Sequence, residues 1–342
     1  MEQLRVAILG YGGISRSHHH AYRLLAEEGF PVRLCALCDI DPAQFDQTVS
    51  INLGESAQTA SDGLHLYTSL EDMLAAEKPD VVDVCLPTYL HKEYVLRLLR
   101  AGVHVQCEKP MALSAADCDE MIRAADQAGR YLMIGQCLRF SADYLALKEL
   151  LDSGRIGRPL TMRMERLSSL PRWGFEGWYH DVNRSGGCML DLAIHDFDMA
   201  RFLFGEPEKV SAIARDGITP QQWSDSRLFF PDGLVVSVNA SWNESASFPF
   251  TCTFRLTAEH ATVLWDGQHP LRVFPDAGEP YTLSYPARDY MAEEIRFLAT
   301  CILKNCQNHK NPPSSARNTV LLANTLRESA ARGGEVLRFS PD

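Results

Sequence analysis

Asp191 and His195 stand four residues apart in a stretch that opens on two glycines. This spacing predicts a tight glycine turn followed by one helix on which both side chains share a face. The neighbouring face carries the apolar side chains of Leu190, Ile194 and Phe197. A carboxylate and an imidazole at the edge of that apolar stripe would be partly desolvated, which moves a pKa toward neutrality and suits general acid–base catalysis. The same pattern also fits a histidine that only satisfies a hydrogen bond in the core.

Lys109 follows the apolar stretch 103–107 in the sequence Glu108-Lys109-Pro110. At the end of a strand its ammonium group would face a cleft rather than bulk water, with Pro110 fixing the backbone beside it. A surface lysine beside a solvent-exposed turn is the alternative.

A glycine-rich turn begins at Gly10, directly after an apolar stretch and before a helical pattern. In this setting Gly10 makes the turn, and Gly12 lets the backbone approach a pyrophosphate. Gly13 and Ile14 then open the helix, whose first N–H groups are available to phosphate oxygens. Ser15 replaces the third glycine of the dinucleotide fingerprint, a position that needs only a small side chain for helix–strand packing.

Asp39 ends the next apolar stretch, 32–38, and lies 29 residues after Gly10. It is placed to accept hydrogen bonds from both hydroxyls of the adenosine ribose. Its charge would repel a 2′-phosphate, and the next residue is Ile40 rather than a cation, so the pattern favours NAD over NADP. The alternative is an aspartate that only starts a turn.

Further apolar stretches at 4–9, 81–86, 103–107 and 131–135 read as buried parallel strands. Together they predict a doubly wound Rossmann sheet in a domain of residues 1–136. Ligands bind beyond the carboxyl ends of such strands, so the loop 87–91 and the residues after 107 should line the cofactor. The cofactor-binding candidates in this region are Leu86, Pro87, Thr88, His91, Glu108 and Lys109.

The composition of the 342 residues excludes several classes of function. The chain is 46% hydrophobic and 23% charged, as in an ordinary globular enzyme of two domains. Its net charge of −11 argues against a nucleic acid or an anionic membrane as partner. We find no signal-peptide pattern and no run of ~20 apolar residues. Because the ten cysteines are scattered in apolar runs, we expect free thiols in a cytoplasmic protein.

Residues 137–342 read as a second, α+β domain. Short apolar segments between about 208 and 284 are separated by Pro-Asp-Gly and Asp-Gly turns, which is typical of antiparallel strands. Helices are predicted over 142–153, 288–305 and 315–331. The loop 171–181 is rich in aromatic residues, of which Trp178 and Tyr179 could stack on a sugar ring or form a subunit contact.

These motifs resemble those of the Gfo/Idh/MocA family, the group of glucose–fructose oxidoreductase and inositol dehydrogenase. The likeness covers the glycine turn, Asp39, the loop 87–91, Glu108-Lys109-Pro110 and the Gly-Gly-x-x-x-Asp-x-x-x-His element. It implies a nucleotide-binding domain followed by a domain with a large open, mostly antiparallel sheet. Such a sheet often packs on another subunit, so we expect a homodimer or homotetramer formed through it. Arg139 lies in a segment that resembles the family's loop on the substrate side, and it could anchor substrate hydroxyls or form a salt bridge at the domain interface.

The resemblance implies hydride transfer between NAD, or NADP, and a carbinol of a sugar, cyclitol or related polyhydroxylated molecule. It also implies that Lys109, Asp191 and His195 surround the reacting hydroxyl. We expect His195 to accept the proton, Asp191 to orient it or hold a neighbouring hydroxyl, and Lys109 to stabilise the alkoxide. Lys109 could instead be the acid/base, because a cationic nicotinamide nearby would depress its pKa.

Three alternatives stay open at this point. An NAD-dependent glycosidase would use the same residues for transient oxidation and elimination, with no net NADH. A regulatory NAD-binding protein would bind the cofactor without turnover. A metal site built from Asp191, His195 and His180 lacks a third ligand at a fixed spacing, and Lys109 would disfavour a cation nearby, so no metal is expected.

Overall fold

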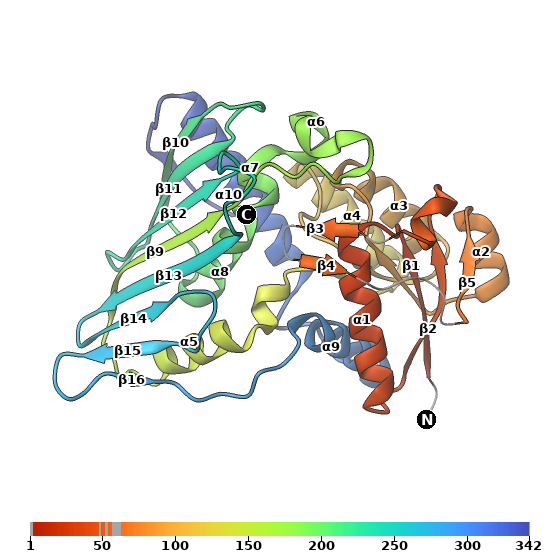
Figure 1. The fold of residues 1–342 in the computed structure, drawn as a ribbon, viewed down its shortest axis with the longest axis horizontal. Coiled ribbons are helices and arrows are strands. Elements are labelled where there is room, and N and C mark those ends of the chain that lie inside the picture. The colour runs from red at the N-terminus through yellow and green to blue at the C-terminus, as the bar shows by residue number, and fades with distance from the viewer. Residues whose placement is uncertain (1–2, 48, 52–53, 57–62, 342) are drawn as a thin grey trace. The chain divides into compact units, whose positions relative to one another are not determined.

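The computed structural model describes residues 3–47, 49–51, 54–56 and 63–341. They divide into two compact units, each of which is described by itself (Figure 1). The first unit comprises Met1–Cys137, Pro171–Trp178 and Asp289–Arg317. The second comprises Leu138–Leu170, Tyr179–Arg288 and Asn318–Asp342. The sequence predicts a single domain boundary after residue 136. In the structure, two later segments, Pro171–Trp178 and Asp289–Arg317, also belong to the first unit.

The first unit is built on a six-stranded parallel sheet in the order β5-β2-β1-β6-β7-β8. Its strands are β1 Leu4–Leu9, β2 Val32–Cys38, β5 His65–Tyr67, β6 Val81–Val84, β7 His104–Cys107 and β8 Leu132–Ile134. A short antiparallel pair, β3 Val49–Ile51 and β4 Gly54–Ser56, lies outside this sheet. The strand order reverses at β1, so the predicted doubly wound sheet is confirmed and has its topological switch point beside the glycine turn.

The residues that follow four of these strands are held in register by backbone hydrogen bonds. The bonds run from Gly10 N to Cys38 O (2.8 Å), Cys85 N to Leu9 O (2.8 Å), Glu108 N to Val84 O (2.9 Å) and Gly135 N to Cys107 O (2.8 Å). The carboxyl ends of β1, β6, β7 and β8 therefore form one continuous edge.

The helices of this unit are α1 Gly13–Glu27, α2 Leu70–Glu77, α3 Thr88–Arg100, α4 Ala115–Ala128 and α9 Tyr290–Lys304, with a 3-10 turn at Pro42–Phe45. Ser69 and Ser114 cap α2 and α4 by accepting the backbone N–H of the third residue beyond them. Helix α9 belongs to this unit because it packs along α1. Arg296 of α9 pairs with Glu28 and lies over the ring of Phe30, 4.9 Å from its centroid.

The second unit is built on a nine-stranded sheet in the order β16-β15-β14-β13-β9-β12-β11-β10-β17. Its strands are β9 Pro159–Leu167, β10 Lys209–Arg215, β11 Trp223–Phe229, β12 Val235–Ser241, β13 Thr251–Ala258, β14 Ala261–Trp265, β15 Arg272–Pro275, β16 Tyr281–Thr282 and β17 Leu337–Arg338. Only β9 and β12 pair in parallel, so the predicted large, mostly antiparallel sheet is confirmed.

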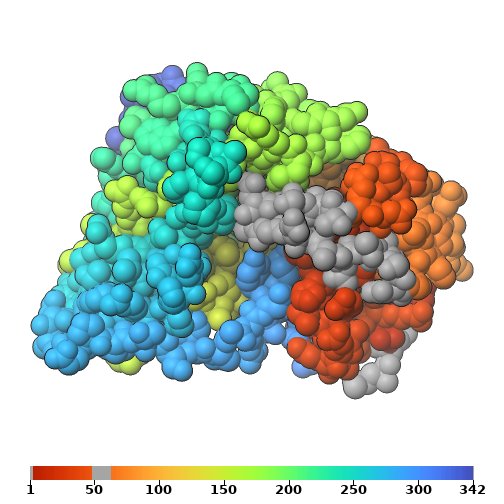
Figure 2. Space-filling view, in the orientation of Figure 1, coloured from red at the N-terminus to blue at the C-terminus, as the bar shows by residue number. Residues whose placement is uncertain are grey.

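One face of this sheet is covered within the unit. The helices are α5 Ala142–Asp152, α6 Val182–Ser185, α7 Gly187–Asp191, α8 Ile194–Phe204 and the part of α10 Pro313–Ala331 that follows Arg317. Tyr144 of α5 packs against Phe254 and Trp265, with ring centroids 5.3 and 5.5 Å apart. Alternate residues along β10 to β14 are buried, while those between them are half-buried or exposed. Figure 2 shows side chains of the cyan and light-blue strand segments at the surface of this unit.

Within the described ranges, none of the helices combines the length and the apolar character that a bilayer span requires.

Candidate active site

The two glycines Gly10 and Gly12 before α1 have different surroundings. Gly10 has φ +88°, and a Cβ there would lie 2.7 Å from the carbonyl oxygen of Cys85, so close packing against the next strand requires glycine. A Cβ on Gly12 would meet nothing within 4 Å, which leaves space at the first turn of α1. Gly12 is also the N-cap residue and brings no side-chain cap. The first N–H groups of α1 therefore adjoin open space, as phosphate binding requires.

Ser15 fits the position where the dinucleotide fingerprint has its third glycine. Its side chain is fully buried, and its hydroxyl donates to the carbonyl oxygen of Gly12 at 2.8 Å. The small side chain thus packs inside the turn and ties it to the helix.

Asp39 extends from the end of β2 toward the glycine turn. Its Oδ2 accepts the backbone N–H of Tyr11 at 2.6 Å, and its Oδ1 accepts that of Asp41 at 2.9 Å. Burial raises the pKa of this carboxyl group, and the two N–H donors oppose the rise. Ile40 beside it is 69% exposed and adds no positive charge. A fixed carboxylate followed by an apolar residue suits an unphosphorylated ribose.

The segment 87–91 is the first turn of α3 rather than the predicted loop. Pro87 occupies the N-cap position, and Thr88 begins the helix. Proline is compatible with the start of a helix, where no intrahelical N–H bond is lost. Leu86 and Pro87 are half-buried at the sheet edge. The Thr88 hydroxyl is buried and has no hydrogen-bond partner among the described residues, so a ligand at this edge could supply one.

His91 is buried in α3 at the same edge of the sheet. Its Nδ1 and Nε2 lie 2.9 and 2.7 Å from the carbonyl oxygens of Pro110 and Leu86. Burial lowers its pKa, although these carbonyl oxygens oppose that effect. Because both ring nitrogens face backbone carbonyl oxygens, the imidazole ties together two segments of the edge. A contact of His91 with the cofactor stays a prediction.

A buried cluster behind the edge was not predicted from the sequence. His18 Nδ1 lies 2.7 Å from Asp83 Oδ2, and His18 Nε2 lies 2.8 Å from Glu108 Oε1. Tyr22 donates its hydroxyl to the same Asp83 oxygen at 3.0 Å. An aspartate within the apolar strand Val-Val-Asp-Val is the signal that could have indicated it, since a buried carboxylate needs a partner. The cluster fixes Glu108, the residue before Lys109.

His18 carries a positive charge in this cluster. Burial alone would lower the pKa of its imidazole, but Asp83 and Glu108 raise it well above 6.5. The pKa of Glu108 is lowered, because His18 and Lys109 outweigh the burial of the carboxyl group. The two carboxylates on either side of the ring therefore favour the imidazolium form of His18.

Replacing His18 with glutamine is expected to lower the free energy of unfolding by about 1.5–3 kcal/mol below pH 6.5, because hydrogen bonds to charged groups are lost. Since the folded-state pKa of His18 is raised, its contribution is complete below the unfolded value and declines as pH rises through the folded value. Denaturant unfolding of both proteins from pH 5 to 9 measures this. The exposed His20→Gln is the control, and a pH-independent difference would contradict a charged His18.

Lys109 follows β7 at the same edge and is half-buried. Its backbone N–H donates to Glu108 Oε2 at 3.2 Å, and the peptide bond to Pro110 is cis. Gln136 follows β8, and its buried amide has no hydrogen-bond partner among the described residues. Gln136 is thus a polar group at the edge that the sequence analysis missed.

The segment 186–198 forms two helices rather than the single predicted helix. Helix α7 ends at Asp191 and α8 begins at Ile194. The N–H groups of Leu192 and Ala193 both donate to the carbonyl oxygen of Cys188, which interrupts the regular ladder. The bond from Ala193 to Cys188 spans five residues and widens the helical turn. Such widened turns occur often at functional sites, and no residue type marks them in the sequence as proline marks a kink.

Asp191 and His195 lie on either side of this break. Asp191 is the last residue of α7 and is buried, whereas His195 is the second residue of α8 and is half-buried. The two residues belong to the second unit and Lys109 to the first. The convergence of these three side chains stays a prediction.

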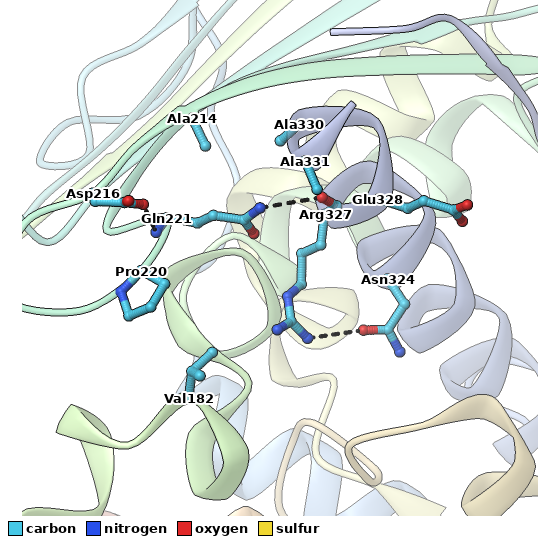
Figure 3. Close-up of a pocket in the computed structure, with 10 residues that line it drawn as sticks. All are labelled: Val182, Ala214, Asp216, Pro220, Gln221, Asn324, Arg327, Glu328, Ala330 and Ala331. Carbon is cyan, nitrogen blue, oxygen red and sulfur yellow. Dashed lines mark hydrogen bonds between the residues drawn. The ribbon is translucent and has the colours of Figure 1, made fainter. Parts of the chain in front are cut away.

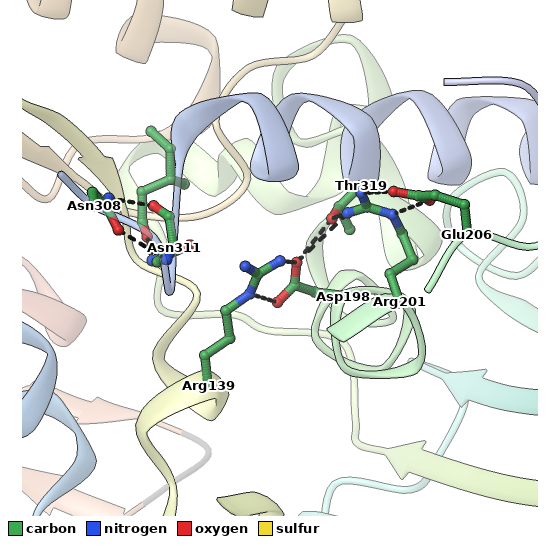
Figure 4. A network of polar contacts seen from close by, with 8 residues as sticks. Arg139, Asp198, Arg201, Glu206, Asn308, Asn311 and Thr319 are labelled. Atoms are coloured by element: carbon green, nitrogen blue, oxygen red, sulfur yellow. Dashed lines mark hydrogen bonds and ion pairs between the residues drawn. The ribbon is translucent and has the colours of Figure 1, made fainter. Parts of the chain in front are cut away.

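Arg139 forms a buried ion pair with Asp198 (Figure 4). Its Nε and Nη2 donate to the two carboxylate oxygens of Asp198, each at 2.7 Å. Thr319 donates to Asp198 at 2.9 Å, and Arg201 joins Thr319 to Glu206. Arg139 and Asp198 belong to the same unit, so this pair is internal to the unit and leaves the substrate contact of Arg139 a prediction.

The two predicted aromatic contacts are buried side chains. Trp178 and Tyr179 are each 8% exposed and end a 3-10 segment, Phe175–His180, in which Glu176 has a left-handed backbone. The ring of Tyr179 packs edge-on against Trp242 with a centroid distance of 6.0 Å. Their contact with substrate stays a prediction.

One group of side chains has the spacing of metal ligands. Over the described ranges, His18, Asp83 and Cys85 form the one group of three whose ligand atoms lie within 4.8 Å of one another. Both nitrogens of His18 face carboxylates at hydrogen-bond distance, so the group is explained without a metal. Asp191, His195 and His180 do not form such a group.

Comparison with known protein families matches both halves of the chain. Residues 4–136 match a family described as "Oxidoreductase family, NAD-binding Rossmann fold". Residues 144–263 match the "GFO/IDH/MocA C-terminal domain".

Characterised relatives include several dehydrogenases. D-apiose dehydrogenase of Paraburkholderia graminis is 32% identical over 274 residues, which is 76% of this chain and 69% of that protein. Inositol 2-dehydrogenase of Rhizobium meliloti is 28% identical over 96% of both chains. D-glucoside 3-dehydrogenase of Escherichia coli is 34% identical, and that match spans just over half of its length, 57%.

Solved structures share the whole fold. Levoglucosan dehydrogenase in complex with NADH has a TM-score of 0.84 at 20% identity and covers 99% of this chain and 100% of its own. Aldose–aldose oxidoreductase from Caulobacter crescentus, complexed with glycerol, has a TM-score of 0.82 at 24% identity, with 98% and 100% covered.

Proposed function

Because the chain belongs to the Gfo/Idh/MocA family of NAD-binding oxidoreductases, we propose that it transfers a hydride between nicotinamide and a carbinol or ketone of a sugar, cyclitol or sugar derivative. The observation that carries this proposal is the set of residues at the carboxyl ends of the parallel strands. There the glycine turn, the fixed Asp39 carboxylate and Lys109 follow neighbouring or nearby strands.

The described residues fit a bound dinucleotide. The space at Gly12 and the uncapped start of α1 would receive the pyrophosphate, and Asp39 would accept hydrogen bonds from ribose hydroxyls. The unpartnered hydroxyl of Thr88 gives a further polar contact at the same edge. The dinucleotide, when bound, accepts or donates the hydride at C4 of its nicotinamide.

The chain's own groups handle the proton and the charge. In alcohol oxidation the imidazole of His195 takes the hydroxyl proton, and Asp191 orients the imidazole or holds a neighbouring hydroxyl. The ammonium group of Lys109 stabilises negative charge on the substrate oxygen. Glu108, His18 and Asp83 hold the backbone from which Lys109 extends.

The test is NADH formation with a panel of polyhydroxylated substrates. The panel starts with inositol, apiose and a glucoside, the substrates in the relatives' names, and each is assayed with NAD and with NADP. A dehydrogenase yields one NADH per product. Aglycone release without net NADH would favour the glycosidase mechanism, and tight NAD binding without turnover on the whole panel would favour a regulatory protein.

Replacing Asp39 with asparagine is expected to reduce the preference for NAD over NADP by about tenfold or more. The substitution removes the charge that repels a 2′-phosphate, and one charge-assisted hydrogen bond to ribose is worth about 1.5–3 kcal/mol. The ratio of kcat/KM for the two cofactors measures the change. Asp46→Asn, an exposed change of equal charge nearby, should leave the ratio unaltered, and an unchanged ratio in Asp39→Asn would reject the ribose contact.

We also infer a homo-oligomer formed through the second sheet. Its less buried face carries the half-buried Val235 and Leu264 and the 53% exposed Ile213. Light scattering of the purified protein tests this inference, and a monomer at micromolar concentration would reject it.

A further inference from the structure

A pocket of about 620 Å³ lies between α10, α6 and the loop that follows β10. Figure 3 shows its lining residues, among them Val182, Asp216, Gln221, Asn324, Arg327 and Glu328. Its volume falls within the range of about 300–1,000 Å³ that is typical of small-molecule sites. Neither Asp191 nor His195 is among the residues that line it.

Arg327 lines this pocket and has no ion-pair partner among the described residues. Its guanidinium Nη1 donates to Asn324 Oδ1 at 3.2 Å, and no carboxylate in the described part of the chain lies within salt-bridge distance of it. Burial lowers its pKa, with no neighbouring acid to oppose the effect. A guanidinium stays charged in proteins, so this desolvation favours an anion beside it.

The two carboxylates of the pocket are engaged elsewhere. Asp216 accepts the backbone N–H of Gln221 at 2.8 Å, and Glu328 pairs with Arg332. In Figure 3 the guanidinium of Arg327 extends toward Val182, while the Glu328 carboxylate points away from it. Arg327 is therefore the one cation among the residues that line the pocket.

The loop beside Arg327 is held in an unusual conformation. Gln221 has φ +51°, a left-handed backbone that is uncommon for residues other than glycine. Besides its bond to Asp216, it donates its side-chain amide to the carbonyl oxygen of Arg327 at 3.2 Å. Backbone strain of this kind is concentrated at binding sites, where the surrounding contacts maintain it.

We propose that this pocket binds a small polyhydroxylated molecule through its anionic group, a carboxylate or a phosphate, with Arg327 as the counter-charge. A guanidinium can donate two parallel hydrogen bonds to either group. The amides of Gln221 and Asn324 line the same pocket and supply donors and acceptors suited to hydroxyl groups.

Titration calorimetry of the full-length chain tests the proposal with gluconate, glucose 6-phosphate, inorganic phosphate and glucose as separate titrants. We expect gluconate, glucose 6-phosphate or both to bind, and glucose to bind far more weakly. Which of the two anionic sugars binds identifies the carboxylate or the phosphate as the anionic group. Absence of binding up to about 10 mM of either anionic sugar would overturn the proposal. Equal affinity for inorganic phosphate and glucose 6-phosphate would overturn the inference that the pocket also binds the hydroxyl groups of the ligand.

Variants assign any binding to this pocket. Arg327→Gln should weaken the anion about ten- to a hundredfold, whereas Arg155→Gln, an exposed change of equal charge, should not. The unfolding temperature of Arg327→Gln without ligand should be unchanged or higher, because a half-buried charge without an ion-pair partner is removed. His195→Ala should retain the binding. Loss of binding in His195→Ala, or full binding in Arg327→Gln, would place the anion elsewhere, whatever the outcome for the proposed redox function.

Discussion

Turnover is expected to fall by about 10²–10⁴-fold when His195 is replaced with alanine, while the affinity for NAD stays nearly unchanged. The proposed role of His195 is proton transfer in the chemical step, and it is not among the residues proposed to hold the dinucleotide. The measurement combines kcat at saturating NAD and substrate with a separate titration of NAD binding.

The controls separate the chemistry from folding. His20→Ala changes an exposed histidine of α1 and should leave turnover intact. Lys109→Met tests the alternative proton carrier: if Lys109 is the acid/base, its loss should remove the ionisation seen in the pH dependence of kcat, and His195→Ala should keep it. Loss of NAD binding in His195→Ala, with normal turnover at saturating cofactor, would contradict the assignment.

Replacing Arg139 with methionine is expected to lower the free energy of unfolding by about 3–5 kcal/mol. The substitution leaves the buried carboxylate of Asp198 without its bidentate partner, and an unpaired buried charge is among the most destabilising changes in a protein core. Urea unfolding followed by far-UV circular dichroism gives the value.

The double variant Arg139→Met/Asp198→Leu is the matched control. It removes both charges, so it should recover part of the lost stability, since apolar replacements of buried ion pairs are often tolerated. The Arg139→Met variant also tests the substrate contact. A raised KM at a temperature where the variant is folded would support it, whereas a purely structural Arg139 predicts an unchanged KM. A loss below about 1 kcal/mol would contradict a buried, desolvated pair.

The sheets were the most predictable part of this chain. Apolar runs predict β1 at 4–9 and β14 at 261–265 with the bounds that the structure has, because buried strands leave a direct hydrophobic signal. The turn at Gly10 was predictable for a related reason, since its backbone conformation and its contact with Cys85 require glycine. β5 was missed, because its residues are half-buried or exposed and carry no such signal.

The remaining features depend on contacts between distant segments. His18 and Glu108 are 90 residues apart, and nothing local marks them as partners. The return of α9 to the first unit depends on its packing against α1, which an amphipathic helix alone does not specify. The break between α7 and α8 comes from one shared carbonyl oxygen, a backbone effect that side-chain spacing cannot indicate.

The arrangement of the nine-stranded sheet has a consequence for biosynthesis. β9 is made first, yet its two neighbours, β12 and β13, are separated from it by more than 60 residues of chain. β10 pairs with β11 on one side, and its other edge is covered by β17, the last of the nine strands to be made. While the ribosome is still at work, the nascent second unit therefore carries an open strand edge, the kind of surface on which chains aggregate and chaperones act.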